Sequence, residues 1–524
     1  ASKTKNKFHG FAFTPELLES RRLLTAGPTI TVTATTATAS GITGANGHFT
    51  FTRTGSTASS IKVYYHGGGT INSHEYTKLS GVVVIPGGHS SAVVNVVPKT
   101  GLTIAEDPTL ILNITQNKSY RRGSPHTATV TVNEAHGEVE GEQFSIPITV
   151  NSGSYARTDE PVDNSINFTS AISSAGGSGP LVANSIRVVE VDGSGNVIDS
   201  NVPYQFNHAS GFDANTNASG DLIIQMSGAT AANTARHYKV QFATSGSFTA
   251  PTFTNQVSLN TSATDSVGFG ADAITNNTAT YFVQQGTGGI SEILDSNNND
   301  WVGFNNSAGS AGLFRGVPNM GVTGGLHPSN GTNYPNVTAT TTVVNSGPLE
   351  TTINVVSSDG NVNVTYAFYN NFVRATVNSE TESPNYWFLY EGTPGGTFST
   401  SDKLVTSDGA NQTLDQSYDA TNGIGGGNTT TGQWASFQSQ GENRFIYFAQ
   451  NTQDTIEDSY FDLNNEMTVF GFGRTLDPNT GGARVESGTK MFTFGIANGN
   501  STAATTINGQ YRDLSVTPGS ATEL

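Results

Sequence analysis

Four side chains in the C-terminal half of the chain are of the kinds that transfer protons and hold acidic groups. Glu391 ends the apolar run Tyr386–Tyr390, and Arg315 and His327 lie twelve residues apart in segments rich in Gly and Pro. A carboxylate or a histidine can act as general acid or base, and an arginine can bind a carboxylate through two hydrogen bonds. This chemistry suits an acidic substrate, so Arg315, His327, Tyr390 and Glu391 are the predicted catalytic residues.

Three further residues are candidates for binding a sugar. Trp387 and Trp434 offer flat rings that can stack on a sugar face, and Arg374 offers a positive charge. A structural role remains open for all of these positions. Trp387 is then a core residue, which its apolar surroundings favour, His327 is an ordinary loop histidine, and Arg315 pairs with Glu391 to tie a loop to the end of a strand.

Two short segments place oxygen-bearing side chains at alternate positions, as calcium-binding loops do. They are Asp213 to Asp221 and Asp295 to Asp300, and the first lacks the closing glutamate of an EF-hand. Plain polar turns explain both segments as well, and we favour that interpretation. Calcium is therefore only a possible cofactor, and its predicted ligands are Asp213, Asn215, Asn217, Asp221, Asp295, Asn297 and Asn299.

The strand that carries Tyr390 and Glu391 needs a large β-structure to position it. Five large apolar residues in succession, closed by Gly and Pro, are typical of a strand that is buried on both faces. Short segments of this kind recur through residues 271–524, with all three tryptophans and little sign of helix. More than ten strands in one unit predict two large packed sheets.

The chain before residue 271 divides into smaller predicted parts. Residues 28–135 contain seven short strand segments with Gly-rich turns, which predicts a β-sandwich. Residues 136–250 form a second β-sandwich, and residues 251–270 are a linker or a first edge strand. The predicted fold class is all-β, with several sandwich domains, a large supersandwich-like C-terminal domain and an extended N-terminal arm.

Composition restricts the class of protein. Charged residues make up 12% of the 524 residues, about half of the ~25% that is usual, and such a surface is typical of extracellular β-proteins. A net charge of -17 argues against a nucleic-acid partner. The chain has no cysteine, so disulfides cannot stabilise it. No apolar run approaches the ~20 residues of a membrane span, so we expect a secreted or cell-surface protein without one.

Residues 28–135 resemble a Calx-beta domain. The resemblance rests on the segments Phe49–Gly55, Val82–Pro86 and Ala105–Asn113 and covers the whole of this part. Some Calx-beta domains bind calcium through clustered carboxylates, but this chain offers few acids there, namely Glu75, Glu106, Asp107 and Glu134. The resemblance therefore implies a spacer domain more than a calcium sensor.

The C-terminal part is similar to galactose-mutarotase-like supersandwich domains. Gly288–Asp295, followed by Asp300–Phe304, resembles their opening hairpin. Such domains occur in carbohydrate epimerases, polysaccharide lyases and hydrolases, so the resemblance implies carbohydrate chemistry or carbohydrate binding. No complete catalytic signature of that family is present.

The first 27 residues differ from the rest because they are basic. Leu18–Ala26 resembles the short N-terminal motif of secreted planctomycete proteins, Leu-Glu-x-Arg-x-Leu-Leu, which implies export. An extended arm of this kind can add a strand to the open sheet edge of a neighbouring subunit.

Two functions follow from these features. The favoured hypothesis is a cell-surface structural or adhesive protein that forms a homo-oligomer, a filament or a layer through its N-terminal arm. The alternative is a secreted protein, a polysaccharide lyase or a carbohydrate-binding protein, that acts on acidic polysaccharide.

Overall fold

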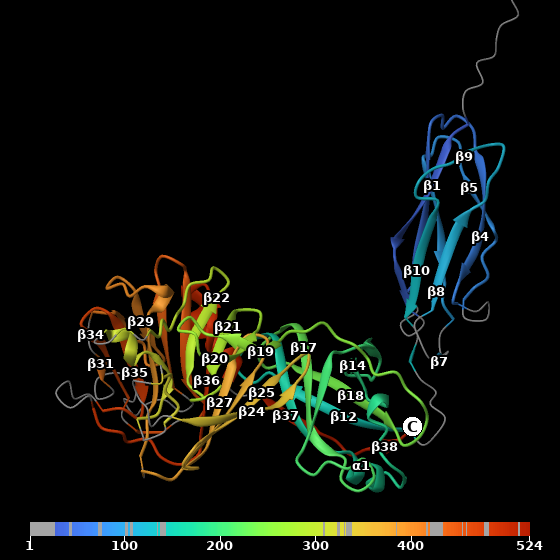
Figure 1. Cartoon of the computed structure of the whole chain (residues 1–524). Helices are drawn as coiled ribbons and strands as arrows, with labels where there is room; N and C mark the ends of the chain where they lie inside the picture. The colour runs from blue at the N-terminus through green and yellow to red at the C-terminus, as the bar shows by residue number, and fades with distance from the viewer. Residues whose placement is uncertain are drawn as a thin grey trace, which may run out of the picture. The chain divides into compact units, whose positions relative to one another are not determined.

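The chain is an all-β protein, as the sequence predicts. A computed structural model describes residues 27–40, 45–71, 76–99, 103–104, 108–133, 135–136, 143–305, 307, 310–321, 325–329, 331, 338–383, 385–415, 418–419, 433–452, 454–456, 458–475, 482–511 and 514–524. The predicted arm before Gly27 and the acids Glu75, Glu106, Asp107 and Glu134 lie outside these residues. Two compact units divide the chain at Glu138 (Figure 1).

The first unit is a sandwich of two antiparallel-rich sheets. Phe49 and Phe51 on one strand and Leu110 and Leu112 on another turn their side chains into the shared core, because alternate residues of a strand point to the same face. One sheet has the order β6 (Ser91–Val96), β3 (Gly47–Thr54), β1 (Thr29–Thr36), β9 (Arg121–Arg122), and the other β2 (Thr38–Ser40), β10 (Thr127–Asn133), β8 (Thr109–Ile114), β4 (Ile61–Gly69), β5 (Val82–Ile85); β7 (Thr103–Ile104) pairs with β11 (Ala135–His136).

The second unit begins with a smaller sandwich. Its long central pair, β12 (Gln143–Asn151) with β18 (Ala235–Ala243), is regular over nine residues on each side. The chain returns to this sandwich at its C-terminus, where β37 (Ser515–Pro518) and β38 (Thr522–Glu523) pair with β12 (Figure 1). The strands are β12 (Gln143–Asn151), β14 (Arg187–Val191), β15 (Val197–Asp199), β18 (Ala235–Ala243), β37 (Ser515–Pro518) and β38 (Thr522–Glu523) in one sheet, and β13 (Arg157–Asn167), β16 (Tyr204–His208) and β17 (Ser219–Thr230) in the other.

The rest of the second unit is a large sandwich of two nine-stranded sheets. One sheet runs β19 (Ser258–Thr264), β20 (Gly270–Thr275), β21 (Ala279–Gln284), β22 (Ile290–Asp295), β23 (Gly316–Asn319), β28 (Phe388–Gly392), β35 (Met467–Phe472), β34 (Ser459–Leu463), β31 (Tyr418–Asp419). The other runs β24 (Ala339–Ser346), β25 (Thr351–Ser357), β26 (Val362–Phe368), β27 (Val373–Glu380), β36 (Lys490–Asn498), β33 (Arg444–Gln450), β32 (Gln433–Ser439), β29 (Lys403–Thr406), β30 (Asn411–Thr413).

Strand β28 lies inside its sheet and is buried on both faces along its whole length. Its inward residues pack on aromatic residues of the facing sheet, with Phe388 stacked on Phe492 and Tyr390 stacked on Phe448. The apolar run around Trp387 therefore forms a centre of the core.

The helices are few and short in the described residues. They are α1 (Phe168–Ser174), α2 (Ala503–Tyr511) and the 3-10 turns η1 (Ala183–Ser185), η2 (Ala311–Phe314), η3 (Pro394–Gly396) and η4 (Asn500–Thr502). Within the part of the chain that the structure describes, we find no helix with the length and hydropathy of a membrane span.

Candidate functional site

Strand β28 sends Tyr390 and Glu391 to opposite faces of the sheet, because neighbouring residues of a strand alternate. The Tyr390 hydroxyl donates to the backbone oxygen of Trp301 over 2.7 Å inside the core. Burial is the main reason why the pKa of Tyr390 lies well above its usual value. Tyr390 is thus held as a neutral core donor and does not share a site with the Glu391 carboxylate.

Glu391 and His327 come together on the outer face of β28. The Oε2 atom of Glu391 lies 4.0 Å from Nε2 of His327 and accepts a hydrogen bond of 2.9 Å from the Asn319 side chain. Both residues are buried, with exposed fractions of 6% for Glu391 and 2% for His327. Burial raises the pKa of Glu391 to about 7 and lowers that of His327. The two groups lie near each other without a direct hydrogen bond, and both are covered.

The backbone fixes the His327 ring. Its Nδ1 lies 2.6 Å from the Pro328 oxygen and its Nε2 lies 2.9 Å from the Phe314 oxygen. Each nitrogen therefore faces a hydrogen-bond acceptor, an arrangement that suits the protonated ring and opposes the effect of burial. An imidazole held in this way is poorly placed to reach a substrate.

Arg315 does not form the predicted pair with Glu391. Its Nη1 and Nη2 atoms each donate over 3.0 Å, to the backbone oxygens of Gly303 and Glu466. Arg315 follows the 3-10 turn η2, and the guanidinium ties this loop to the hairpin between β34 and β35. Of the four predicted catalytic residues, the structure therefore brings only His327 and Glu391 together.

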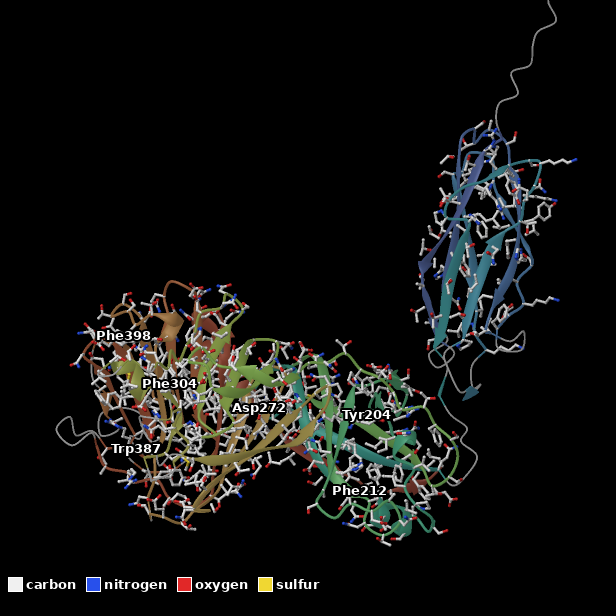
Figure 2. The ribbon with its side chains drawn as sticks, in the orientation of Figure 1. Tyr204, Phe212, Asp272, Phe304, Trp387 and Phe398 are labelled. Carbon is white, nitrogen blue, oxygen red and sulfur yellow. The ribbon has the colours of Figure 1, made fainter. Side chains whose placement is uncertain are left out.

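Arg474 is a neighbour of Glu391 that the sequence did not single out. Its guanidinium lies 4.6 Å from the ring centroid of Phe461 and 5.8 Å from that of Trp387, and Nη1 donates to the Ser459 hydroxyl over 2.9 Å. Burial lowers the pKa of Arg474, and Glu391 opposes this effect. Trp387, half-buried in the large sandwich (Figure 2), thus stacks on an arginine of its own chain.

The other two predicted sugar-binding residues make internal contacts. Trp434 is 4% exposed and packs in an apolar cluster with helix α2. Arg374 on β27 forms a 2.5 Å ion pair with Asp163 on β13, and its guanidinium lies 5.1 Å from the ring centroid of Tyr369. Arg374 therefore joins the smaller sandwich to the large one.

The predicted calcium loop at Asp213 is closed by its own backbone. The Asp213 Oδ1 atom accepts from the backbone nitrogens of Asn215 and Thr216, each over 2.9 Å. The Asn217 amide donates to the Gly211 oxygen over 3.0 Å, and Asp221 accepts from Ser165 across the strand pair. These contacts are those of a polar turn next to a strand.

The loop at Asp295 already holds a positive charge. Asp295 accepts from the backbone nitrogens of Asn297 and Asn299 over 2.8 and 3.0 Å, and its Oδ2 lies 2.8 Å from Nη1 of Arg444. Although burial opposes them, these partners and the indole of Trp301 lower the pKa of Asp295. Across the described ranges no three His, Asp or Glu side chains are grouped to hold a metal ion.

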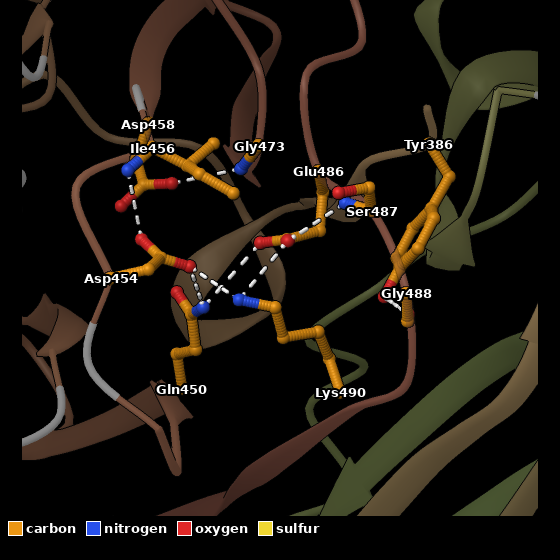
Figure 3. A network of polar contacts seen from close by, with 10 residues as sticks. All are labelled: Tyr386, Gln450, Asp454, Ile456, Asp458, Gly473, Glu486, Ser487, Gly488 and Lys490. Atoms are coloured by element: carbon orange, nitrogen blue, oxygen red, sulfur yellow. Dashed lines mark hydrogen bonds and ion pairs between the residues drawn. The ribbon is translucent and has the colours of Figure 1, made fainter. Parts of the chain in front are cut away.

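A polar network of the large sandwich lies at the ends of β33 and β36 (Figure 3). The Lys490 Nζ atom lies 2.6 Å from Oδ2 of Asp454 and 3.2 Å from Oε1 of Glu486. Gln450 donates to the same Asp454 oxygen, and Asp458 accepts from the Gly473 nitrogen over 2.8 Å. The sequence gives no signal for this network, because its acids and its lysine are scattered over 37 positions.

Comparisons with known proteins identify no family. No family model and no curated protein matches the chain. Among solved structures it is similar to an α-mannosidase from Enterococcus faecalis V583, with a TM-score of 0.40, 9% identity and coverage of 72% of this chain. The chain spans only 46% of that mannosidase.

Calx domains are also among the similar structures. The apo form of the Calx CBD1 domain matches with a TM-score of 0.19 and 15% identity, over 21% of this chain and 97% of that domain. CBD12 from CALX1.2 matches with a TM-score of 0.20 and 12% identity, over 42% of this chain and 77% of that one. Similarity at this level indicates neither an activity nor a partner.

Proposed function

We propose that this protein is a secreted structural or adhesive protein of the cell surface that assembles from copies of itself. In this assembly, the N-terminal segment of one copy adds as a strand to the open edge of the large sandwich of the next. The observation that carries the proposal is the edge strand β24, an eight-residue strand without a charged residue.

Strand β24 has the properties of an acceptor edge. It ends the order of its sheet, and β25 is its hydrogen-bonded neighbour among the described strands. Natural edge strands are usually protected by Lys, Pro or inward-pointing charges, and the sequence of β24 contains none of these. The ladder with β25 is regular from Ala339 to Val343, shifts its register at Val344 and resumes at Asn345 and Ser346. Val344 is 52% exposed.

The N-terminal segment has the composition of a donor for this edge. Residues 1–26 carry five basic and two acidic residues, whereas the whole chain has a net charge of -17. The segment is three times as long as β24 and includes the alternating run Phe11-Ala12-Phe13-Thr14. Backbone hydrogen bonds then supply affinity, and the opposite charges bring the copies together.

A head-to-tail contact of this kind extends into a filament or layer unless symmetry closes it into a ring. The inward position of predicted catalytic and sugar-binding residues fits a structural role. Tyr390 and Trp434 are buried, and Arg374 links two sandwiches.

A charge placed on the acceptor edge tests the proposal. Val344→Lys should weaken assembly, measured by light scattering of the purified full chain, because the lysine blocks strand addition. Val84→Lys is the matched control, since Val84 is 45% exposed on the other unit's edge strand β5. Equal assembly of the two variants would exclude β24 as the acceptor.

A second candidate function is action on acidic polysaccharide. The contact between His327 and Glu391, with the pKa of Glu391 raised to about 7, is the observation that favours it. An absorbance assay for unsaturated uronate products tests this candidate, with His327→Ala as control. If the His327→Ala variant still forms these products, the activity does not depend on the pair of His327 and Glu391.

A further inference from the structure

The network around Lys490 has the arrangement that an amide bond between two side chains requires. Lys490 begins β36, and Gln450 ends the neighbouring strand β33, where it pairs with Phe492. This register places Lys490 beside the loop that follows β33 and that carries Asp454. The amine nitrogen thus lies 2.6 Å from a carboxylate oxygen of Asp454.

Glu486 is rigidly held beside the same amine. Its side chain is fully buried and its Oε1 atom lies 3.2 Å from the Lys490 Nζ atom. Its backbone nitrogen donates a hydrogen bond to the Tyr386 oxygen over 3.0 Å, and its backbone oxygen accepts one from the Tyr386 nitrogen over 2.8 Å. A side chain at Gly473 would come within 2.2 Å of the Glu486 Cβ atom, so this glycine lets the two segments approach closely. Burial raises the pKa of Glu486, so this carboxylate accepts a proton readily.

Gln450 completes the arrangement. Its Nε2 atom donates to Oδ2 of Asp454, and its own Oε1 atom has no hydrogen-bond partner among the described residues. A donor aimed at a carboxylate oxygen stabilises the negative charge that grows there when an amine attacks the carbon.

We propose that Lys490 and Asp454 condense to an intramolecular isopeptide bond, with Glu486 as the proton carrier. The bond between Nζ of Lys490 and Cγ of Asp454 forms, and a bond between Cγ and one carboxylate oxygen breaks. The ammonium group gives up two protons, passed by Glu486 to the departing oxygen, which leaves as water. An ammonium and a carboxylate thereby become a neutral amide and water, and no other reactant is required.

The reaction starts from the ion pair. Burial lowers the pKa of Lys490, but Asp454 and Glu486 outweigh this effect and the net shift is upward. An ammonium nitrogen has no free lone pair, so proton transfer from Nζ to Glu486 must precede attack on the carbon. Holding the two reacting groups in contact replaces the encounter of separate molecules, which accounts for large rate gains in intramolecular reactions.

A bond at this place suits a chain that has no cysteine. It closes the segment from Asp454 to Lys490 into a covalent ring that includes β34 and β35, and β35 pairs with β28. This inference is independent of the assembly proposed above, since it concerns the interior of one copy.

The mass of the denatured full chain tests the inference. The wild-type protein should be lighter than its sequence by one water, and fragmentation should yield a peptide that joins residues 454 and 490. Lys490→Arg and Glu486→Gln should keep their full sequence masses. Asp454→Asn should lose one ammonia instead, because its amide is the leaving group.

Lys62→Arg serves as the matched control and should still lose one water, since Lys62 is exposed on β4 of the other unit. A wild-type chain with its full sequence mass after incubation at neutral pH would overturn the inference. A loss of water without the joined peptide would overturn it as well. Tryptophan fluorescence of each variant shows whether its fold is retained.

Discussion

Replacing Glu350 by glutamine should make the second unit more stable than the wild type at alkaline pH. Glu350 is 5% exposed, and its carboxylate accepts from Asn207 between the two sandwiches. Burial, and then the charge of Asp163, raise its pKa from 4.5 to about 7. A carboxyl group with a raised pKa in the folded state contributes stability that is present at low pH and lost as the pH rises.

The size of the effect follows from the shift. This stability is lost between the pKa of the unfolded state, 4.5, and the pKa of the folded state, about 7. The loss amounts to about 3 kcal/mol, at ~1.4 kcal/mol for each pH unit. A glutamine keeps the shape and the acceptor oxygen but has no charge to bury. The free energy of unfolding of Glu350→Gln, relative to wild type, should therefore rise by about 2 to 3 kcal/mol between pH 4.5 and pH 8.

Urea unfolding followed by tryptophan fluorescence measures this difference, because all three tryptophans lie in the second unit. Glu160, with a pKa raised to about 8 chiefly by burial, titrates in the same unit and remains in both proteins. The exposed Glu466 provides the control variant Glu466→Gln. If the free energies of unfolding of Glu350→Gln and wild type changed in parallel over this pH range, Glu350 would not be a buried carboxyl group with a raised pKa.

Three further predictions concern single contacts. Arg53→Met should cost the first unit about 2 to 4 kcal/mol, seen as faster amide hydrogen exchange there, because the buried guanidinium donates four hydrogen bonds to backbone oxygens. A double-mutant cycle of Arg374→Met and Asp163→Asn should give a coupling of about 1 to 3 kcal/mol in urea unfolding, and additive effects would contradict the ion pair between the sandwiches. Asp295→Asn should lower the unfolding midpoint of the second unit whether or not calcium is present, because Asp295 pairs with Arg444; an effect confined to calcium-containing buffer would contradict this role.

The sequence predicts the β-structure well where burial repeats along a strand. The apolar residues around Tyr386 and Phe388 indicate a strand buried on both faces, and β28 is one. Alternating apolar residues such as Phe49 and Phe51 predict the first sandwich in the same way. These patterns are local, so a single segment contains all of the signal.

The site depends on contacts that no local pattern contains. His327 meets Glu391 because one loop folds over β28, and Arg444 reaches Asp295 from a strand 149 residues away. Alternating Asp and Asn residues suit both a calcium loop and a turn that bonds to its own backbone, so the sequence cannot separate these alternatives. The return of β37 to the smaller sandwich is also long-range, and β19 occupies the segment expected as a linker or an edge strand.

The mass in solution of the full chain, compared with that of a chain lacking residues 1–26, tests the proposed assembly most directly. Light scattering should show oligomers or filaments of the full chain that grow with concentration, and a monomer when these residues are removed. A full chain that stays monomeric at the same concentrations would contradict assembly by strand addition, and so would an equally assembled shortened chain.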